Sequence, residues 1–516
     1  MGDQTGGRLP VIYVRGFAGG PSGINTAVDD PFYGFNEGSV QVRVDDTDRP
    51  AFHQFESPLL RLMIDHGYQL LVQGNQGAYL EQRPDGSIDP TTIWVHRFYD
   101  EFAPNLTKDP NAFSIERAAE SLFDLVRLVR RKTGAPRVFL VAHSMGGLIV
   151  RSMIQKVAPE QTGGSPDAAK DFVDRVFTYA TPHGGIEFAI GFGALEKLRD
   201  LTGLAGADIF GPARMYQYLT PAGSAQDRVP DGWDATVMPD DGFPKDRFFC
   251  LVGTNPTDYT SAFGLSAKAV GARSDGLVQI DNAYVRGTPR ALVHRSHSGR
   301  FGIVNSEEGY QNLQRFLFGD VEVRAQLTDV VVPGTPDDDT VWQLEASLSI
   351  RGLPVVLHEQ STAHLCPIQL ERPKAPDTTS TPIPLVRTFL STKATRPDVS
   401  TMRHVLQLRL LSLRKKDHLL SFLDHLEQTA DWSDVLVVDI AFRADGTPPR
   451  SWAVWSSSLG TAIRDWVPDQ ASDAELQDMD SATGSWLAQI QLPVAARKLL
   501  GPQAAITIAV NGRQPA

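Results

Sequence analysis

One serine in the first third of the chain has the neighbours that a nucleophile needs. Ser144 comes just after a continuous apolar run at residues 138–142 and is followed by Met145, two glycines and a second apolar run. A strand, a sharp turn and a helix in this order expose a serine hydroxyl at the tip of the turn. Ala142 and Gly146 are small enough to let strand and helix approach. The segment indicates covalent catalysis by Ser144, and the alternative is an ordinary strand-turn-helix with a buried serine.

The elements that must position this serine follow from the apolar pattern between about residues 11 and 320. Five short runs are apolar without alternation, as expected of strands that are buried on both faces. Between them, Ser114 can cap a helix that Gly134 would end. The pattern predicts an α/β domain with a mainly parallel sheet. The expected strands are residues 11–14, 69–72, 138–141, 176–179 and 248–252.

After about residue 320 the apolar residues alternate with polar ones. A period of two is typical of half-buried antiparallel strands, and loops rich in Pro, Thr and Asp separate the runs. We therefore expect an α/β catalytic domain over residues 1–325 and an all-β, sandwich-like accessory domain over residues 326–516. The alternating runs are residues 342–350, 406–410, 438–442, 486–492 and 506–510.

The segment around Ser144 resembles the α/β-hydrolase superfamily, in the lipase-like branch that includes bacterial triacylglycerol lipases and GPI inositol-deacylases. The resemblance covers about residues 10–318 and includes the chain order nucleophile, acid, histidine. Ala142 replaces the first glycine of the family motif, which is the smallest possible departure. The resemblance implies an α/β-hydrolase fold and a serine hydrolase activity for this part of the chain.

The resemblance also implies an oxyanion hole made of two backbone amides. Met145, directly after the serine, supplies the first. Residues 14–20 resemble the family's His-Gly-Phe loop, which makes the Phe17 amide the second donor. Arg15 stands where the family usually has histidine, a departure that concerns the contacts of the loop rather than the amide. The alternative is a glycine-rich loop that serves only as a turn.

The acid of the site is likewise implied by the resemblance. Residues 273–279 are similar to the family's Ser-Asp-Gly-Leu-Val segment, and Asp275 takes the place of the carboxylate that orients the catalytic imidazole. Asp281 and Asp258 are alternatives. Asp275 could instead serve only to close an Asp-Gly turn.

The base is expected on the loop after the last strand of the sheet. Residues 290–296 have the pattern of that strand, and a helix is expected from 307 to 318. His297 opens the loop between them, where a histidine can reach over to Ser144, so we prefer it as the base. His294, within the strand, is the alternative.

Two further histidines and one insertion lie close to the expected site. His143 precedes the nucleophile but should point away from it as a packed neighbour, and His183 is expected to be a hydrogen-bonded loop histidine that lines the site. Residues 186–245 form an insertion with apolar residues at helical spacing. Such a segment suits a lid or acyl-binding cap, and the alternative is a packed helical excursion.

Composition excludes several other classes. A chain of 516 residues is long enough for two or more domains, and 41% hydrophobic with 21% charged residues is typical of a globular protein. The net charge of −12 provides no basic surface for nucleic acid. Two cysteines, Cys250 and Cys366, exclude a disulfide framework. We find no zinc-ligand or nucleotide-binding motif, so we expect no cofactor and no catalytic metal, with a structural calcium ion left open.

The leading function is therefore a serine carboxylester hydrolase, an esterase or lipase whose partner is an ester or lipid substrate. The same groups would serve amide or thioester hydrolysis or acyl transfer, and a non-catalytic binding scaffold is a further alternative. Residues 1–10 do not form a secretory signal, and no run of about 20 apolar residues is present. We expect a soluble cytoplasmic protein; secretion by a removed leader, peripheral contact with a lipid surface and the oligomeric state stay open.

Overall fold

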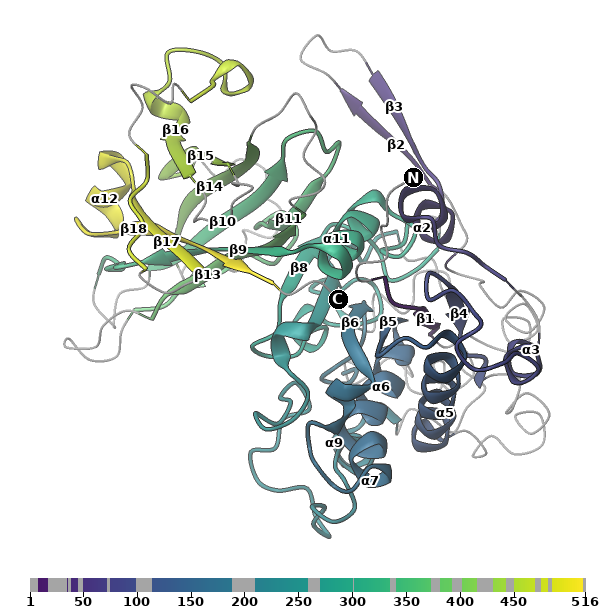
Figure 1. Ribbon diagram of the computed structural model, residues 1–516. Helices are drawn as coiled ribbons and strands as arrows, with labels where there is room; N and C mark the ends of the chain where they lie inside the picture. Colours follow the sequence, from purple (N-terminus) through teal and green to yellow (C-terminus); the bar gives the residue numbers. More distant parts are fainter. Residues whose placement is uncertain are drawn as a thin grey trace. The chain divides into compact units, whose positions relative to one another are not determined.

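The computed structural model divides the chain into two compact units (Figure 1). The first comprises Met1–Arg290 and His294–Leu317, and the second comprises Ala291–Val293 and Phe318–Pro515. The structure describes residues 8–16, 35, 39–44, 50–71, 75–98, 114–187, 209–258, 270–299, 301–334, 340–372, 381–391, 401–414, 430–441, 450–468, 475–480 and 485–513.

A six-stranded sheet in the order β4-β1-β5-β6-β7-β8 is the scaffold of the first unit. The pairs β1–β4, β1–β5, β5–β6 and β6–β7 are parallel, which confirms the mainly parallel sheet predicted from the continuous apolar runs. The strands are β1 (Val11–Val14), β4 (Ile93–Val95), β5 (Val138–His143), β6 (Val173–Tyr179), β7 (Phe248–Gly253) and β8 (Arg290–Val293).

The strand predicted at residues 69–72 is wrong in its described part. Gln69 makes only an isolated parallel bridge with Thr92, and Val72 lies outside the described residues. The sheet edge is instead β4, which pairs with β1. The three apolar residues of β4, between polar neighbours, are too few to predict a strand from their pattern. Their burial depends on the pairing of β4 with β1.

Helices cover both faces of this sheet, and their ends follow local signals. Helix α5 (Ile115–Thr133) begins after Ser114, whose Oγ accepts the Arg117 N–H, and ends at Gly134 with a φ of 70°. Both ends were predicted, and so was α11 (Glu307–Phe318). The other helices of the unit are α2 (Pro58–His66), α3 (Gln76–Glu81), α6 (Met145–Ser152), a π-helical turn (Met153–Val157), α7 (Ala158–Gln161) and α9 (Pro212–Leu219).

Alternate strand residues pack against opposite layers of helices. Leu140, Val176 and Cys250 belong to the core that includes α5 and α6. On the other face, Phe249 stacks on Phe177, with ring centroids 4.9 Å apart, and lies 5.2 Å from Phe316 of α11. Burial on both faces explains why these strands are continuously apolar. A separate hairpin pairs β2 (Ser39–Val44) with β3 (Pro50–Phe55).

The second unit consists of two antiparallel sheets around one core. One sheet has the order β11-β10-β14-β15-β16, with β12 beside β10, and the other has the order β13-β9-β18-β17. Inward residues of both sheets, such as Leu344, Leu408 and Ile508, share one hydrophobic cluster, as in a sandwich. The strands and helix are β9 (Val321–Thr328), β10 (Thr340–Ile350), β11 (Val356–Gln360), β12 (Ile368–Leu370), β13 (Ile383–Leu390), β14 (Met402–Arg414), β15 (Trp432–Ala441), β16 (Arg450–Trp455), β17 (Ser485–Gln491), α12 (Val494–Leu500) and β18 (Ala505–Gly512).

The domain boundary expected between residues 325 and 326 falls inside a strand. Strand β9 pairs along its length with β13 and β18, so residues 321–325 belong to the antiparallel sheet. The main segment of the second unit begins at Phe318, the last residue of α11. The β9 sequence alternates apolar and polar residues from Val321 onward, so the alternation begins a few residues before the expected boundary.

Candidate active site

Ser144 occupies a strained turn between β5 and α6. Its φ of 52° and ψ of −130° are rare for a residue with a side chain, and its N–H donates to Tyr179 O at 2.9 Å. The turn depends on a glycine, because a Cβ on Gly146 would lie 2.5 Å from Arg15 O. Gly146 thus allows a close approach of α6 to the end of β1, whereas the approach expected there was to the strand before Ser144.

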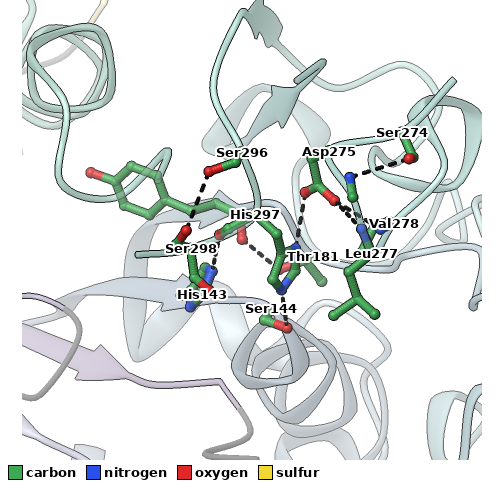
Figure 2. Close-up of polar contacts among 12 residues, drawn as sticks. His143, Ser144, Thr181, Ser274, Asp275, Leu277, Val278, Ser296, His297 and Ser298 are labelled. Carbon is green, nitrogen blue, oxygen red and sulfur yellow. Dashed lines mark hydrogen bonds and ion pairs between the residues drawn. The ribbon is translucent and has the colours of Figure 1, made fainter. Parts of the chain in front are cut away.

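His297 connects this serine to Asp275 (Figure 2). Its Nε2 lies 2.9 Å from Ser144 Oγ, and its Nδ1 lies 2.9 Å from Asp275 Oδ2. The three residues are 8%, 3% and 1% exposed in the order Ser144, His297, Asp275. Because little water reaches them, the hydrogen bonds between them are stronger than they would be on the surface.

The proton positions in this chain of contacts follow from the partners of Asp275. Its Oδ1 accepts the N–H groups of Leu277 at 3.0 Å and Val278 at 2.8 Å, which stabilise an ionised carboxylate. An ionised carboxylate accepts only, so His297 Nδ1 carries the hydrogen toward Oδ2. The lone pair of neutral His297 is then on Nε2, and the Ser144 hydroxyl donates to it.

The alternative residues lie elsewhere in the first unit. His294 is exposed, and its Nδ1 lies 3.4 Å from Thr254 Oγ1. The side chain of Asp281 is 71% exposed and pairs with Arg273. Asp258 accepts from the side-chain amide of Asn255 at 2.7 Å. The structure thus brings His297 and Asp275 to Ser144 and places the three alternatives in other contacts.

Of the two amides expected to form an oxyanion hole, that of Met145 lies within the described residues. Met145 is the first residue of α6, so its N–H has no acceptor within the helix and points out of the helix N-terminus. Phe17 lies outside the described residues. Its neighbour Gly16 is close to the nucleophile, because a Cβ on Gly16 would lie 2.8 Å from Ser144 Cβ. Arg15 is 5% exposed.

The hydrogen bond of His183 and the packing of the described part of the expected cap involve residues other than Ser144, His297 and Asp275. His183 is fully buried, and its Nε2 lies 3.1 Å from Thr178 Oγ1, which is within hydrogen-bond distance. Burial and the nearby Arg151 guanidinium hold the pKa of His183 well below its usual value. Within the insertion of residues 186–245, helix α9 packs into the core of the unit, whereas residues 188–208 lie outside the described residues.

The described ranges contain neither a cluster of metal ligands nor a membrane-spanning helix. In these ranges no three His, Cys, Asp or Glu side chains come close enough together to hold a metal ion. None of the helices described is long and apolar enough to cross a membrane.

Sequence reasoning missed one residue of this arrangement. His143, the last residue of β5, contacts the backbone of His297 through its Nε2, which lies 2.9 Å from His297 O. The position directly before the serine was the only available signal, and the turn geometry suggested that the ring points away from Ser144. The contact is to the base rather than to the nucleophile.

One family model matches the part of the chain that contains the strained serine turn. Residues 107–205 match the family described as "Putative serine esterase (DUF676)". The match covers about a fifth of the chain, and together with the parallel sheet and the turn at Ser144 it supports an α/β-hydrolase fold of the lipase-like serine esterase type for the first unit. No curated protein matches the chain significantly.

Solved structures with some similarity are lipases and bacterial proteins. The mature lipase BlEst2 of Bacillus licheniformis is 16% identical, with a TM-score of 0.31, over 61% of this chain and 92% of the lipase. A gene product of Listeria innocua is 10% identical, with a TM-score of 0.25, over 60% and 94% of the two chains. Aspergillus fumigatus lipase B is 11% identical, with a TM-score of 0.24, over 56% and 45%. At such low scores the fold assignment rests on the topology of the chain itself.

We expect Asp275→Asn to reduce kcat for p-nitrophenyl acetate by about 10³–10⁴-fold. The asparagine amide cannot hold His297 in the tautomer that leaves Nε2 free to accept the Ser144 proton. Asp281→Asn is the matched control, because the same change occurs on an exposed residue of the same loop. A larger loss in Asp281→Asn than in Asp275→Asn would contradict the assignment.

Proposed function

We propose that this protein is a serine carboxylester hydrolase that acts through Ser144, His297 and Asp275 and a covalent acyl-enzyme. The observation that supports the proposal best is the continuous hydrogen-bonded chain from Ser144 Oγ through His297 to Asp275, with both contacts at 2.9 Å. A nucleophile within hydrogen-bond reach of a base, and a base oriented by a third group, is the arrangement that activates a hydroxyl.

In the first half of the reaction Ser144 acquires the acyl group. Its hydroxyl proton passes to His297 Nε2 while Oγ forms a bond to the ester carbonyl carbon, and the carbonyl π electrons move to the oxygen. The carbon–oxygen bond to the alcohol then breaks, and His297 returns the proton to the departing alkoxide. Asp275 remains ionised and stabilises the imidazolium that exists between these two transfers.

In the second half water replaces the alcohol. His297 Nε2 takes a proton from water, the resulting hydroxide oxygen bonds to the acyl carbon, and Ser144 leaves with that proton as the carboxylic acid is released. The Met145 N–H and, in our proposal, the Phe17 N–H stabilise the oxyanion that forms in each half. Each such donor contributes about 3–4 kcal/mol where one has been removed by mutation.

Two assays test the proposal and the bond that is cleaved. A fluorophosphonate probe should label the full chain at Ser144, because the probe reacts only with an activated serine. A panel of p-nitrophenyl esters from acetate to palmitate should then show turnover and give the preferred acyl length. An unlabelled Ser144 and no turnover across the panel would favour the binding scaffold, and turnover of amides or thioesters alone would replace the ester assignment.

We further propose that the second unit has an accessory role. It has a hydrophobic cluster of its own, which includes Leu344, Leu408 and Ile508 and extends over both of its sheets. A domain with its own core can in principle be separated. In the proposed reaction all the groups that form or break bonds come from the first unit.

A chain that ends after Gly319 is therefore expected to hydrolyse p-nitrophenyl acetate with a kcat/KM within about threefold of the full chain, because its triad is intact. The cut falls between α11 and β9, so no strand is divided. Activity on emulsified long-chain esters should be measured alongside, since surface binding by the second unit would be lost. A folded, soluble truncation that is inactive on the acetate would place a required group in the second unit.

A further inference from the structure

His143 joins the nucleophile and the base through the backbone. It is the last residue of β5 and directly precedes Ser144, so its position is set by the central sheet. Its Nε2 lies 2.9 Å from the carbonyl oxygen of His297, and the two rings are 5.0 Å apart between centroids. A carbonyl oxygen only accepts, so Nε2 carries a hydrogen and donates it (Figure 2).

This contact adds to three other hydrogen bonds of His297. The His297 N–H donates to Asp275 O at 2.9 Å, and the two ring nitrogens contact Asp275 and Ser144. His143 donates to the backbone carbonyl of the same residue. The backbone of His297 is therefore held on one side by the acid loop and on the other by the strand that presents the nucleophile.

We propose that His143 is a positioning residue that sets the distance between His297 Nε2 and Ser144 Oγ by anchoring the His297 carbonyl to the end of β5. The inference rests on the proposed function, since it concerns the same base and nucleophile. Residues 143 and 297 are far apart in sequence, and β8 ends at Val293, so this contact ties the loop that carries His297 directly to the strand that presents Ser144. A displacement of about 1 Å between reacting groups is enough to cost about 10²-fold in rate.

The charge state of His143 suits this role. Burial of the ring is the main cause that lowers the pKa of His143 to about 3; the charges of a protonated His297 and of Arg15 act in the same direction, and the hydrogen bond to His297 O acts against it. His143 thus stays neutral at working pH. A neutral donor adds no repulsion to the imidazolium that forms on His297 during turnover, whereas a cation in this place would oppose it.

The same ring also lies against the loop that leads to Phe17. A Cβ on Gly16 would be 3.3 Å from His143 Nδ1 and 2.8 Å from Ser144 Cβ. The dipeptide of His143 and Ser144 is thus in contact with the base on one side and with the start of the predicted oxyanion loop on the other.

The test is a set of variants in the full chain that differ in whether residue 143 can donate to His297 O. In His143→Gln the amide nitrogen can reach the place of Nε2, whereas in His143→Asn it is one methylene too short. His143→Leu removes the donor altogether. His96→Leu is the matched control, because His96 is a buried histidine directly after β4 and its ring nitrogen Nε2 lies 3.4 Å from Oγ of Ser121 in α5.

We expect kcat for p-nitrophenyl acetate to fall about 10- to 100-fold in His143→Leu and His143→Asn, and the rate of fluorophosphonate labelling to fall in parallel. The KM should change less than about twofold, because the contact positions His297 and not the substrate. His143→Gln should recover kcat to within about threefold of the unmodified chain. His96→Leu should keep kcat even where its thermal midpoint falls.

If all three His143 variants kept the kcat of the unmodified chain, the inference would be overturned. It would also be overturned if His143→Gln lost as much kcat as a folded His143→Asn variant. If His143→Leu does not fold, the Gln and Asn pair decides alone, since both side chains are neutral amides. Ser144→Ala distinguishes a failure of the proposed function from a failure of the positioning role of His143. A fully active Ser144→Ala removes the proposed function, whereas an inactive Ser144→Ala with unchanged His143 variants removes only the positioning role.

Discussion

Replacement of Ser144 by alanine should lower kcat for a p-nitrophenyl ester by about 10⁴–10⁶-fold. The variant has no oxygen to form the acyl-enzyme, and His297 has no hydroxyl from which to take a proton. A residual rate above that in water is expected, because an oxyanion hole and substrate binding still operate without the nucleophile. Labelling by the fluorophosphonate probe should disappear with the activity.

Stability should respond far less than activity to this change. Alanine keeps the Cβ, so the backbone strain at a φ of 52° is the same in both proteins. The loss is one hydrogen bond to His297, worth about 1 kcal/mol, which corresponds to a fall in Tm of no more than about 3 °C. Calorimetry and single-turnover kinetics on the same preparation check both expectations.

Ser152→Ala is the matched control for Ser144→Ala. Ser152 is a fully buried serine at the end of the same helix, α6, and it has no contact with His297 among the hydrogen bonds of the described residues. The control should keep kcat within about twofold. Full activity in purified Ser144→Ala would refute the mechanism, because the Ser144 hydroxyl could then not be the required nucleophile.

His297→Ala is expected to be about as damaging as Ser144→Ala, with a loss of about 10⁴–10⁶-fold in kcat. Without the imidazole, the hydroxyl proton has no acceptor, and the leaving alkoxide has no donor. The double variant should be no worse than either single variant, since residues that act as one unit do not have additive effects. The comparison of the three rates measures this coupling directly.

His294→Ala distinguishes the two histidines that the sequence left open. We expect it to retain most of the activity, because His294 is exposed and its Nδ1 lies near Thr254. If His294→Ala lost activity and His297→Ala kept it, the base would be His294, and the loop would need to rearrange for catalysis.

Much of the fold could be predicted because the relevant signals are local. The Ser114 cap and the Gly134 stop bound α5, and continuous apolar runs identified β1, β5, β6 and β7. Alternation identified β10, β14, β15, β17 and β18 in the second unit. By contrast, β4 was missed because three residues carry too little pattern, and the domain boundary was placed inside β9.

The sequence by itself determined the nucleophile turn at Ser144, because a buried strand, a small-residue turn and a buried helix are encoded within about a dozen neighbouring residues. The sequence favoured His297 over His294 and assigned Asp275 by resemblance, but the contacts that join these residues to Ser144, and the contact of His143, came only from the tertiary structure. Ser144 and His297 are 153 positions apart, and their 2.9 Å separation depends on the order of strands in the sheet and on where the loops after β7 and β8 return. No local propensity specifies such a distance, because it is the sum of many packing contacts rather than a property of either segment.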